Sequence, residues 1–256
     1  MGTITRRRAF ERTAILAASA VSTSLSGESN QASPGTRSDK LKIVVVGAHP
    51  DDPESSCGGT MARYADLGHE VVALYLTRGE AGIPGKTESE ASAIRTAEAQ
   101  RACNILKARA LFAGQADGKT EVNERRYQEF RSLIESERPD VLFAPWPIDA
   151  HRDHRAASLL AYDAWERLRR RFELYYTEVD LGGETKNFQP THYVDITAVV
   201  ERKRQAFMAH ESQYPRSVYV RYHETMQRFR GLECGCALAE AFVGAFQNPK
   251  RCSLPA

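Results

Sequence analysis

Two short runs of histidine and carboxylate residues carry the chemistry that this sequence offers. They are HPDDPE at residues 49–54 and DAHRDH at residues 149–154. Two imidazoles and one carboxylate, with one position left for water, are a common ligand set for catalytic zinc, although iron, cobalt and manganese accept the same ligands. A bound divalent ion polarises a carbonyl and acidifies its water, and a neighbouring carboxylate can take the proton. The two runs therefore predict metal-dependent hydrolysis.

Each run alone also has an ordinary structural explanation. Pro and Asp favour turns, so residues 49–54 could form only a loop turn. An Asp is favourable near a helix N-terminus, so residues 151–154 could be only the start of a helix. The chemical interpretation is favoured because both runs follow predicted strands that should be neighbours.

The elements that position these runs alternate between strand and helix. Apolar runs rich in Val and Ile indicate strands buried on both faces of a parallel sheet. Strands are expected at residues 41–48, 71–76, 110–112, 141–144, 173–177 and 193–196. Helical periodicity and end signals predict helices at residues 55–67, 91–107, 124–137, 154–170 and 199–210.

Such an alternation predicts a Rossmann-like three-layer α/β sandwich with a mostly parallel central sheet. In the strand order 3-2-1-4-5, strands 1 and 4 are neighbours at the point where the order reverses. The loops after Ala48 and Ala144 would then lie side by side. The site is therefore expected at the carboxyl ends of strands 1 and 4.

The sequences GAHPDDPE and HRDH resemble the LmbE-like, or PIG-L, deacetylase family. The likeness extends from about Leu41 to Phe246 and includes GGT at 58–60, TRGE at 77–80 and AEAF at 239–242. It looks most similar to the bacterial branch that deacetylates glucosaminyl conjugates in low-molecular-weight thiol synthesis. The resemblance implies a Zn²⁺-dependent N-deacetylase that releases acetate and a free amino sugar from an N-acetylglucosamine-type substrate.

The resemblance also implies a role for each residue of the two runs. His49, Asp52 and His154 would be the zinc ligands. Asp51 would act first as the general base and then as the general acid toward the leaving amine. His151 would lie opposite the metal and help to stabilise the oxyanion.

Three further residues receive roles from the same resemblance. Asp153 would orient His151 and favour its protonated form. Arg95 would bind the sugar part of the substrate, and Asp117 would hold sugar hydroxyls. The chain departs from the commonest family pattern at Pro53, where many relatives have Glu, and Pro at a helix start predicts a modest change of loop shape.

Two positions, one histidine and one tryptophan, are each open to two interpretations. His210, followed by Ser212 and Gln213, is expected either at the rim of the pocket or as a helix-end residue that binds carbonyls. Trp146 is expected either to stack on a sugar ring or to anchor the packing of its loop.

The first 40 residues resemble an export segment and a linker. Arg7 and Arg8 precede a short stretch of apolar and small residues, which predicts a twin-arginine-type signal over residues 1–20, with an amphipathic tail as the alternative. Residues 21–40 are rich in Ser, Gly, Asn and Pro and are expected to form a flexible linker before a catalytic domain at 41–250. A periplasmic or extracellular location is expected, which favours an acetamido sugar of the cell envelope or surroundings as substrate.

Composition limits the remaining classes of function. A net charge of +2 gives no reason to expect nucleic-acid binding, and the body of the chain has no apolar run long enough for a membrane span. The five cysteines are an odd number, which argues against a complete disulfide framework.

The expected partner of the protein is a small or glycan-derived acetamido sugar. No stable membrane insertion is expected after signal removal, and the oligomeric state is left open. The alternatives are an amidase acting on a thiol-sugar conjugate and a non-catalytic sugar-binding protein.

Overall fold

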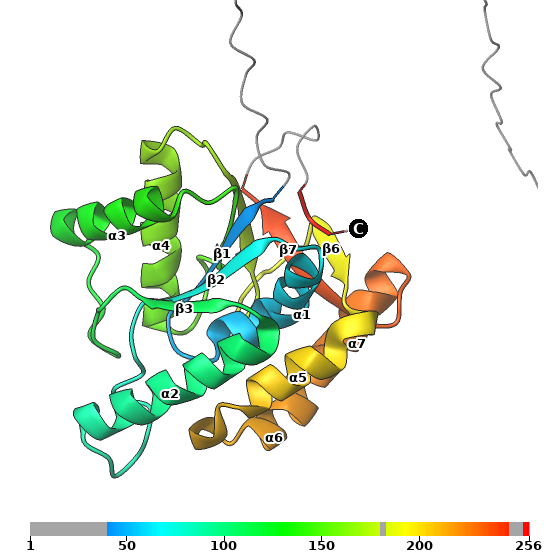
Figure 1. Ribbon diagram of the computed structural model, residues 1–256, viewed down its shortest axis with the longest axis horizontal. Helices are drawn as coiled ribbons and strands as arrows, with labels where there is room; N and C mark the ends of the chain where they lie inside the picture. Colours follow the sequence, from blue (N-terminus) through cyan, green and yellow to red (C-terminus); the bar gives the residue numbers. More distant parts are fainter. Residues whose placement is uncertain (1–39, 180–182, 246–252, 256) are drawn as a thin grey trace, which may run out of the picture. The chain divides into compact units, whose positions relative to one another are not determined.

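A seven-stranded sheet in the order β3-β2-β1-β4-β5-β7-β6 forms the centre of the computed structural model (Figure 1). The structure describes residues 40–179, 183–245 and 253–255. The strands are β1 (Lys42–Gly47), β2 (Glu70–Tyr75), β3 (Arg109–Phe112), β4 (Val141–Pro145), β5 (Glu173–Thr177), β6 (His192–Asp195) and β7 (Ala239–Gly244). β1 to β5 pair in parallel in the predicted order 3-2-1-4-5, so the sequence-based topology is confirmed.

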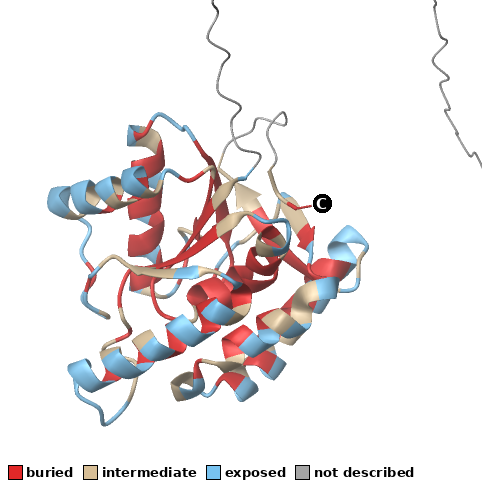
Figure 2. Ribbon diagram, viewed as in Figure 1, coloured by how far each residue is buried: buried red, intermediate tan, exposed pale blue. Residues whose placement is uncertain are grey.

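Helices cover both faces of the sheet and give three layers (Figure 1). One face carries α1 (Asp52–Asp66), α2 (Glu88–Leu106) and α5 (Val200–Met208), and the other carries α3 (Glu124–Glu137) and α4 (Arg152–Arg167). In β1, Ile43 and Val45 pack toward the first group, whereas Val44 and Val46 pack toward the second. Both faces of β1 are therefore buried, as the red strands of Figure 2 show, and this explains its continuous apolar sequence.

Three helices, α1, α2 and α4, begin two to three residues earlier than the periodicity predicts, and capping side chains set the starts of α2 and α4. Thr87 accepts a hydrogen bond from the backbone N–H of Glu90, whose side chain accepts one in return, and α2 begins at Glu88. His151 caps α4, which begins at Arg152. The metal-site runs are therefore at helix N-termini as well as strand ends.

The chain after α5 contains elements that the sequence pattern did not predict. They are α6 (Pro215–Val218), a π-helix (η3, Tyr219–His223), α7 (Glu224–Cys234) and β7, which lies antiparallel between β5 and β6. A buried ion pair joins Lys203 Nζ of α5 to Glu240 Oε1 of β7 at 2.6 Å. Glu240 also accepts backbone hydrogen bonds from Gly59 and Thr60 of α1, so this one carboxylate ties β7 to the layer that carries the first motif.

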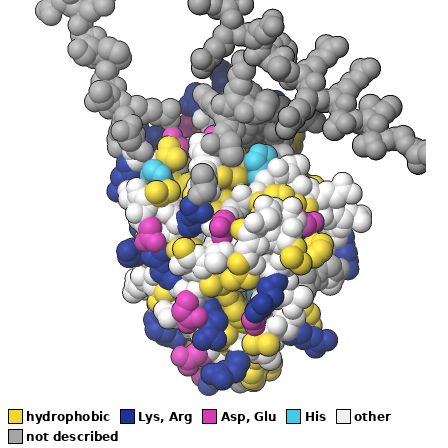
Figure 3. All heavy atoms as spheres, turned by 90° about the vertical axis from the view of Figure 1, so that its right-hand side faces the viewer, with side chains coloured by type: hydrophobic (Ala, Val, Ile, Leu, Met, Phe, Trp, Pro, Cys, Tyr) yellow, Lys and Arg dark blue, Asp and Glu magenta, His cyan; other side chains and the backbone are white. Residues whose placement is uncertain are grey.

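The predicted export signal at 1–20 and linker at 21–40 fall outside the described residues, apart from Lys40, and stay predictions. Within the described ranges, no helix combines the length and hydropathy that a bilayer span requires. The face shown in Figure 3 mixes basic and acidic side chains with small apolar patches. The expectation that nucleic acid is not a partner also stays a prediction.

Candidate active site

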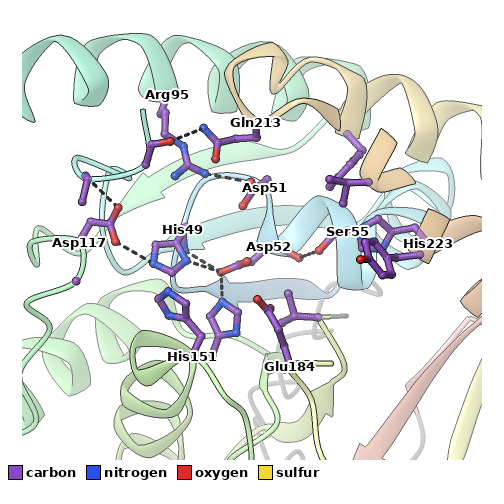
Figure 4. Close-up of a pocket in the computed structure, with 18 residues that line it drawn as sticks. His49, Asp51, Asp52, Ser55, Arg95, Asp117, His151, Glu184, Gln213 and His223 are labelled. Atoms are coloured by element: carbon purple, nitrogen blue, oxygen red, sulfur yellow. Dashed lines mark hydrogen bonds and ion pairs between the residues drawn. The ribbon is translucent and has the colours of Figure 1, made fainter. Parts of the chain in front are cut away.

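The loops after β1 and β4 meet in a pocket of about 580 Å³ (Figure 4). Asp52 Oδ2 lies 3.5 Å from His49 Nδ1 and 3.4 Å from His154 Nε2. The three predicted metal ligands are thus brought together, although 105 positions separate the first from the last in the chain. His151 completes a group of three imidazoles whose nitrogen atoms all lie within 4.8 Å of one another.

The second nitrogen of each ligand histidine is fixed by a carboxylate. His49 Nε2 lies 3.2 Å from Asp117 Oδ1 and 3.3 Å from Asp153 Oδ2. His154 Nδ1 lies 3.1 Å from Asp149 Oδ1. A carboxylate behind a ligating imidazole sets its tautomer and orientation and raises its basicity, so this arrangement is typical of a metal site.

The electrostatics of this cluster favour a positive charge. Burial lowers the pKa of His49, but its contacts with Asp117, Asp153 and Asp52 outweigh burial and raise that pKa well above the usual value. For His154, burial is outweighed by the charge of Asp52 and the hydrogen bond to Asp149, and the pKa rises to about 10. A divalent cation would satisfy the same carboxylates that otherwise favour protons, so the residues present fit a metal ion of the kind that imidazole and carboxylate bind.

Asp51 has a strained backbone at the N-cap of α1, with φ at 120°. Non-glycine residues rarely adopt such a conformation, and strain of this kind costs about 1–3 kcal/mol and clusters at functional sites. The pKa of Asp51 is raised, because burial outweighs the opposing charge of Arg95, whose Nη2 lies 3.0 Å from Asp51 Oδ2. A half-buried carboxyl with a raised pKa beside the predicted metal ligands has the properties of a general base.

Arg95 is buried and is held over the first loop. Its Nη2 donates to the carbonyl of Pro50 at 2.5 Å as well as to Asp51. A Cβ atom at Gly79 or Gly82 would come within 2.5 and 2.3 Å of Arg95 Nη1, so only glycine leaves room for the guanidinium. Arg95 lines the pocket, while its binding of the sugar stays a prediction. The structure adds a contact with Asp51 that can position this carboxylate.

His151 faces the pocket as a neutral donor. Its Nδ1 accepts the backbone N–H of Asp153 at 3.3 Å, which leaves the ring proton on Nε2. Burial lowers the pKa of His151, and the neighbouring His49 and His154 lower it further. An Nε2–H group can donate to a developing oxyanion without a full positive charge.

The two parts of the role predicted for Asp153 have different outcomes. Burial and the neighbouring histidines lower the pKa of His151 overall, whereas the charge of the Asp153 carboxylate acts in the predicted direction and raises that pKa. The direct contacts of the carboxylate are not with His151 but with His49 Nε2, the backbone N–H of Gly118 at 2.7 Å and the hydroxyl of Thr120 at 2.6 Å. Only the backbone N–H of Asp153 contacts the His151 ring. The local reason is the start of α4, which turns adjacent side chains in different directions.

Asp117, predicted to hold sugar hydroxyls, also has a second partner. It lines the pocket, but Oδ1 contacts His49 and Oδ2 accepts the backbone N–H of Ala81 at 3.1 Å. One carboxylate therefore both orients a ligand histidine and faces the substrate space.

Asp149 and the Glu54–His210 pair are the contacts that the sequence reasoning missed. Asp149 stands at the end of β4, five residues before His154, and this i,i+5 placement was the available signal. His210 is not at the pocket rim: it is fully buried, with Nε2 3.6 Å from Glu54 Oε2. Gln213 does line the pocket, whereas Trp146 packs edge-on against Tyr176 and anchors its loop.

Comparisons with known proteins agree with this geometry. A sequence model of the PIG-L family, GlcNAc-PI de-N-acetylase, matches residues 44–165. Diacetylchitobiose deacetylase of Thermococcus kodakarensis is 32% identical over 196 residues, which are 71% of this chain and 73% of that protein. The 1D-myo-inositol 2-acetamido-2-deoxy-alpha-D-glucopyranoside deacetylase of Kineococcus radiotolerans is 56% identical over only 41 residues, 16% of this chain and 11% of that protein.

A solved structure shares the fold. N,N'-diacetylchitobiose deacetylase from Pyrococcus horikoshii, complexed with its inhibitor MPG, superposes with a TM-score of 0.70 at 24% identity and covers 80% of this chain and 84% of that one. The long sequence match, the shared fold and the assembled His/Asp site lead to one conclusion: the chain belongs to the PIG-L family of N-deacetylases, hydrolases that cleave an amide C–N bond.

Proposed function

We propose that this protein hydrolyses the acetamide of an N-acetylglucosamine-type sugar and that its cofactor is Zn²⁺ held by His49, Asp52 and His154. The observation that carries the proposal is Asp51, a half-buried carboxyl with a strained backbone directly beside the ligand set. The family and the printed activities of the matched relatives support the substrate class. Whether the natural substrate is a chitobiose-like sugar or another glucosaminide is the finer part of the proposal.

The residues divide the reaction between them. When bound, the zinc ion supplies Lewis-acid polarisation of the carbonyl and lowers the pKa of a water molecule. Asp51 takes the proton of the attacking water, and Arg95 holds Asp51 in the orientation that this requires. His151 donates its Nε2–H to the carbonyl oxygen as negative charge develops there. Asp51 then returns the proton to the nitrogen of the leaving amine, which frees acetate and an amino sugar.

A thiol-sugar amidase is the second candidate. The short match to the inositol-linked relative does not favour it, because that relative is itself a deacetylase. A non-catalytic sugar-binding role is disfavoured because the position of every residue predicted for catalysis is occupied and Asp51, His151 and the predicted metal ligands line one pocket.

The test is acetate release by the zinc-loaded protein from N-acetylglucosamine and N,N'-diacetylchitobiose, beside mercapturate release from a thiol-sugar conjugate. Asp51→Asn is expected to lower turnover by about 10²- to 10⁴-fold while bound zinc stays the same. Asp66→Asn, at an exposed position of α1, is the matched control and should retain turnover. Parallel loss of zinc and turnover in Asp51→Asn would refute the base assignment, and mercapturate release without acetate release would favour the second candidate.

A further inference from the structure

The pocket continues well past the metal-ligand set. Figure 4 shows Asp117 and Arg95 on one side of Asp52, and Ser55 and His223 on the other. On the His223 side, past Glu184, which lies close to His154, the lining is largely apolar. We name this part the acyl end, formed by Phe207 of α5, Val218 of α6, and Tyr222 and His223 of the π-helix.

The acyl end presents mainly carbon surface, and its polar side-chain atoms are those of the Tyr222 hydroxyl and the His223 imidazole. Phe207 is 4% exposed, and its ring packs edge-on against His223 with centroids 4.8 Å apart. The Ser55 hydroxyl beside this end is engaged by the backbone carbonyl of Asp52 at 2.9 Å. Val218 and Tyr222 are half-buried and line the cavity.

His223 does not bring charge to this end. It is 3% exposed, and its Nδ1 has no hydrogen-bond partner among the described residues. Burial lowers its pKa to about 3, with a further contribution from the charge of Lys203 behind it. A neutral imidazole packed between aromatic rings is a surface that apolar groups can contact.

The π-helix is the local feature that builds this wall. Tyr222 and His223 are consecutive residues, and both line the cavity. π-helical turns are rare and are frequently found at functional sites. The widened turn therefore marks this segment as part of the binding surface.

The chemistry of an amide determines what lies at this end. The carbonyl carbon carries two other substituents, the nitrogen and the acyl carbon, and they point in different directions. The nitrogen must lie near Asp51, which protonates it, and Asp51 is held by Arg95 at 3.0 Å. The amino sugar therefore extends toward Arg95 and Asp117, and the acyl carbon extends toward Ser55 and His223.

The geometry points to a second activity that rests on the proposed function: hydrolysis of N-acyl amino sugars whose acyl chain is longer than acetyl, with the chain seated against Phe207, Val218 and Tyr222. The reaction is the same hydrolysis that is proposed for the acetamide. Water adds across the amide, the C–N bond breaks, and a short-chain carboxylate and a free amine leave. Butanoyl and similar short uncharged chains are the class that this end accepts.

The test measures binding separately from turnover. N-acetyl- and N-butanoyl-glucosamine are titrated calorimetrically into zinc-loaded Asp51→Asn protein, which measures binding. Both compounds are then assayed for carboxylate release with the enzyme that retains Asp51. The butanoyl compound is expected to bind about 15-fold more tightly, from the transfer free energy of two buried methylenes. Val218→Trp in the same background should abolish this ratio by filling the acyl end.

Val220→Trp is the matched control, because Val220 is 56% exposed and lies outside the pocket lining. It should keep the butanoyl preference. Tyr222→Ala, which removes wall surface instead of adding bulk, should lower the preference several-fold and covers the case in which Val218→Trp does not fold.

Acetate release combined with equal or weaker binding of the butanoyl compound overturns the inference and leaves the proposed function standing. Failure to bind or hydrolyse either compound overturns both. If Val218→Trp weakens N,N'-diacetylchitobiose binding but keeps the butanoyl preference, the acyl end holds a second sugar ring and the inference is wrong.

Discussion

The two ends of the pocket hold buried histidines in opposite states. At the metal-ligand end, burial is outweighed by Asp52 and Asp149, and the pKa of His154 rises to about 10. At the acyl end, burial is reinforced by Lys203, and the pKa of His223 falls to about 3. A buried histidine thus favours a positive charge at the first end and stays neutral at the second. The difference comes from the charges next to each imidazole.

The two ends also differ in how they are built. The ligand end comes from loops at the carboxyl ends of parallel strands. There Asp52 accepts hydrogen bonds from two backbone N–H groups, Asp51 accepts a hydrogen bond from Arg95, and His154 contacts the carboxylate of Asp149. The acyl end comes from packed helices after β6, whose side chains contribute shape. The residues proposed to carry out the reaction lie in loops anchored at the ends of the sheet strands. The residues proposed to select the acyl chain lie on the helices that form the opposite wall.

The largest expected effect tests the neutral state of His223 through stability. Because its pKa is lowered from 6.5 to about 3 in the folded protein, the unfolded chain binds the extra proton first. Stability is then full above pH 6.5 and is lost as the pH falls toward 3. Urea unfolding should show that the natural protein loses about 3 kcal/mol more than His223→Gln between pH 7 and pH 4. Equal losses would mean that His223 is charged in the fold, and the contrast with His154 would disappear.

Gly82→Ala tests how closely the ligand end is fixed. The new methyl would lie 2.3 Å from Arg95 Nη1 and would displace the guanidinium that holds Asp51. Acetate release is expected to fall about 10²-fold, since small displacements in an active site have effects of this size. Gly85→Ala, in the same loop, adds its methyl to open space and should retain turnover despite its φ of 78°. Unchanged activity in Gly82→Ala would contradict the positioning role of Arg95.

Asp149→Asn is expected to have the smallest effect of the three. It removes the charge behind His154 Nδ1 without removing a metal ligand. Zinc affinity, measured by competition with a chelator, should fall about 10- to 100-fold. Asp163→Asn on the same helix, where Asp163 pairs with Arg167, should leave the affinity as it was. If both variants bind zinc equally well, the carboxylate behind His154 has no part in tuning the site.

The sequence by itself indicated the strands and placed the two histidine motifs directly after two of them. Apolar runs such as residues 43–46 are typical of central strands, and the order expected for this fold class brings the two motifs to one edge of the sheet. The pattern could therefore predict that the motifs meet, whereas the choice of His49, Asp52 and His154 as metal ligands came from the family resemblance and stays a prediction.

Only the tertiary structure decided which groups stand behind the ligands and what forms the opposite wall. The carboxylate of Asp153 contacts His49 rather than His151, because the start of α4 directs it across the pocket to a partner 104 residues away. The π-helical turn at Tyr222 and His223 has no hydrophobic period that marks it in the sequence. Partner choice and wall shape depend on side-chain directions set by packing between distant segments, and a linear pattern carries no information on those directions.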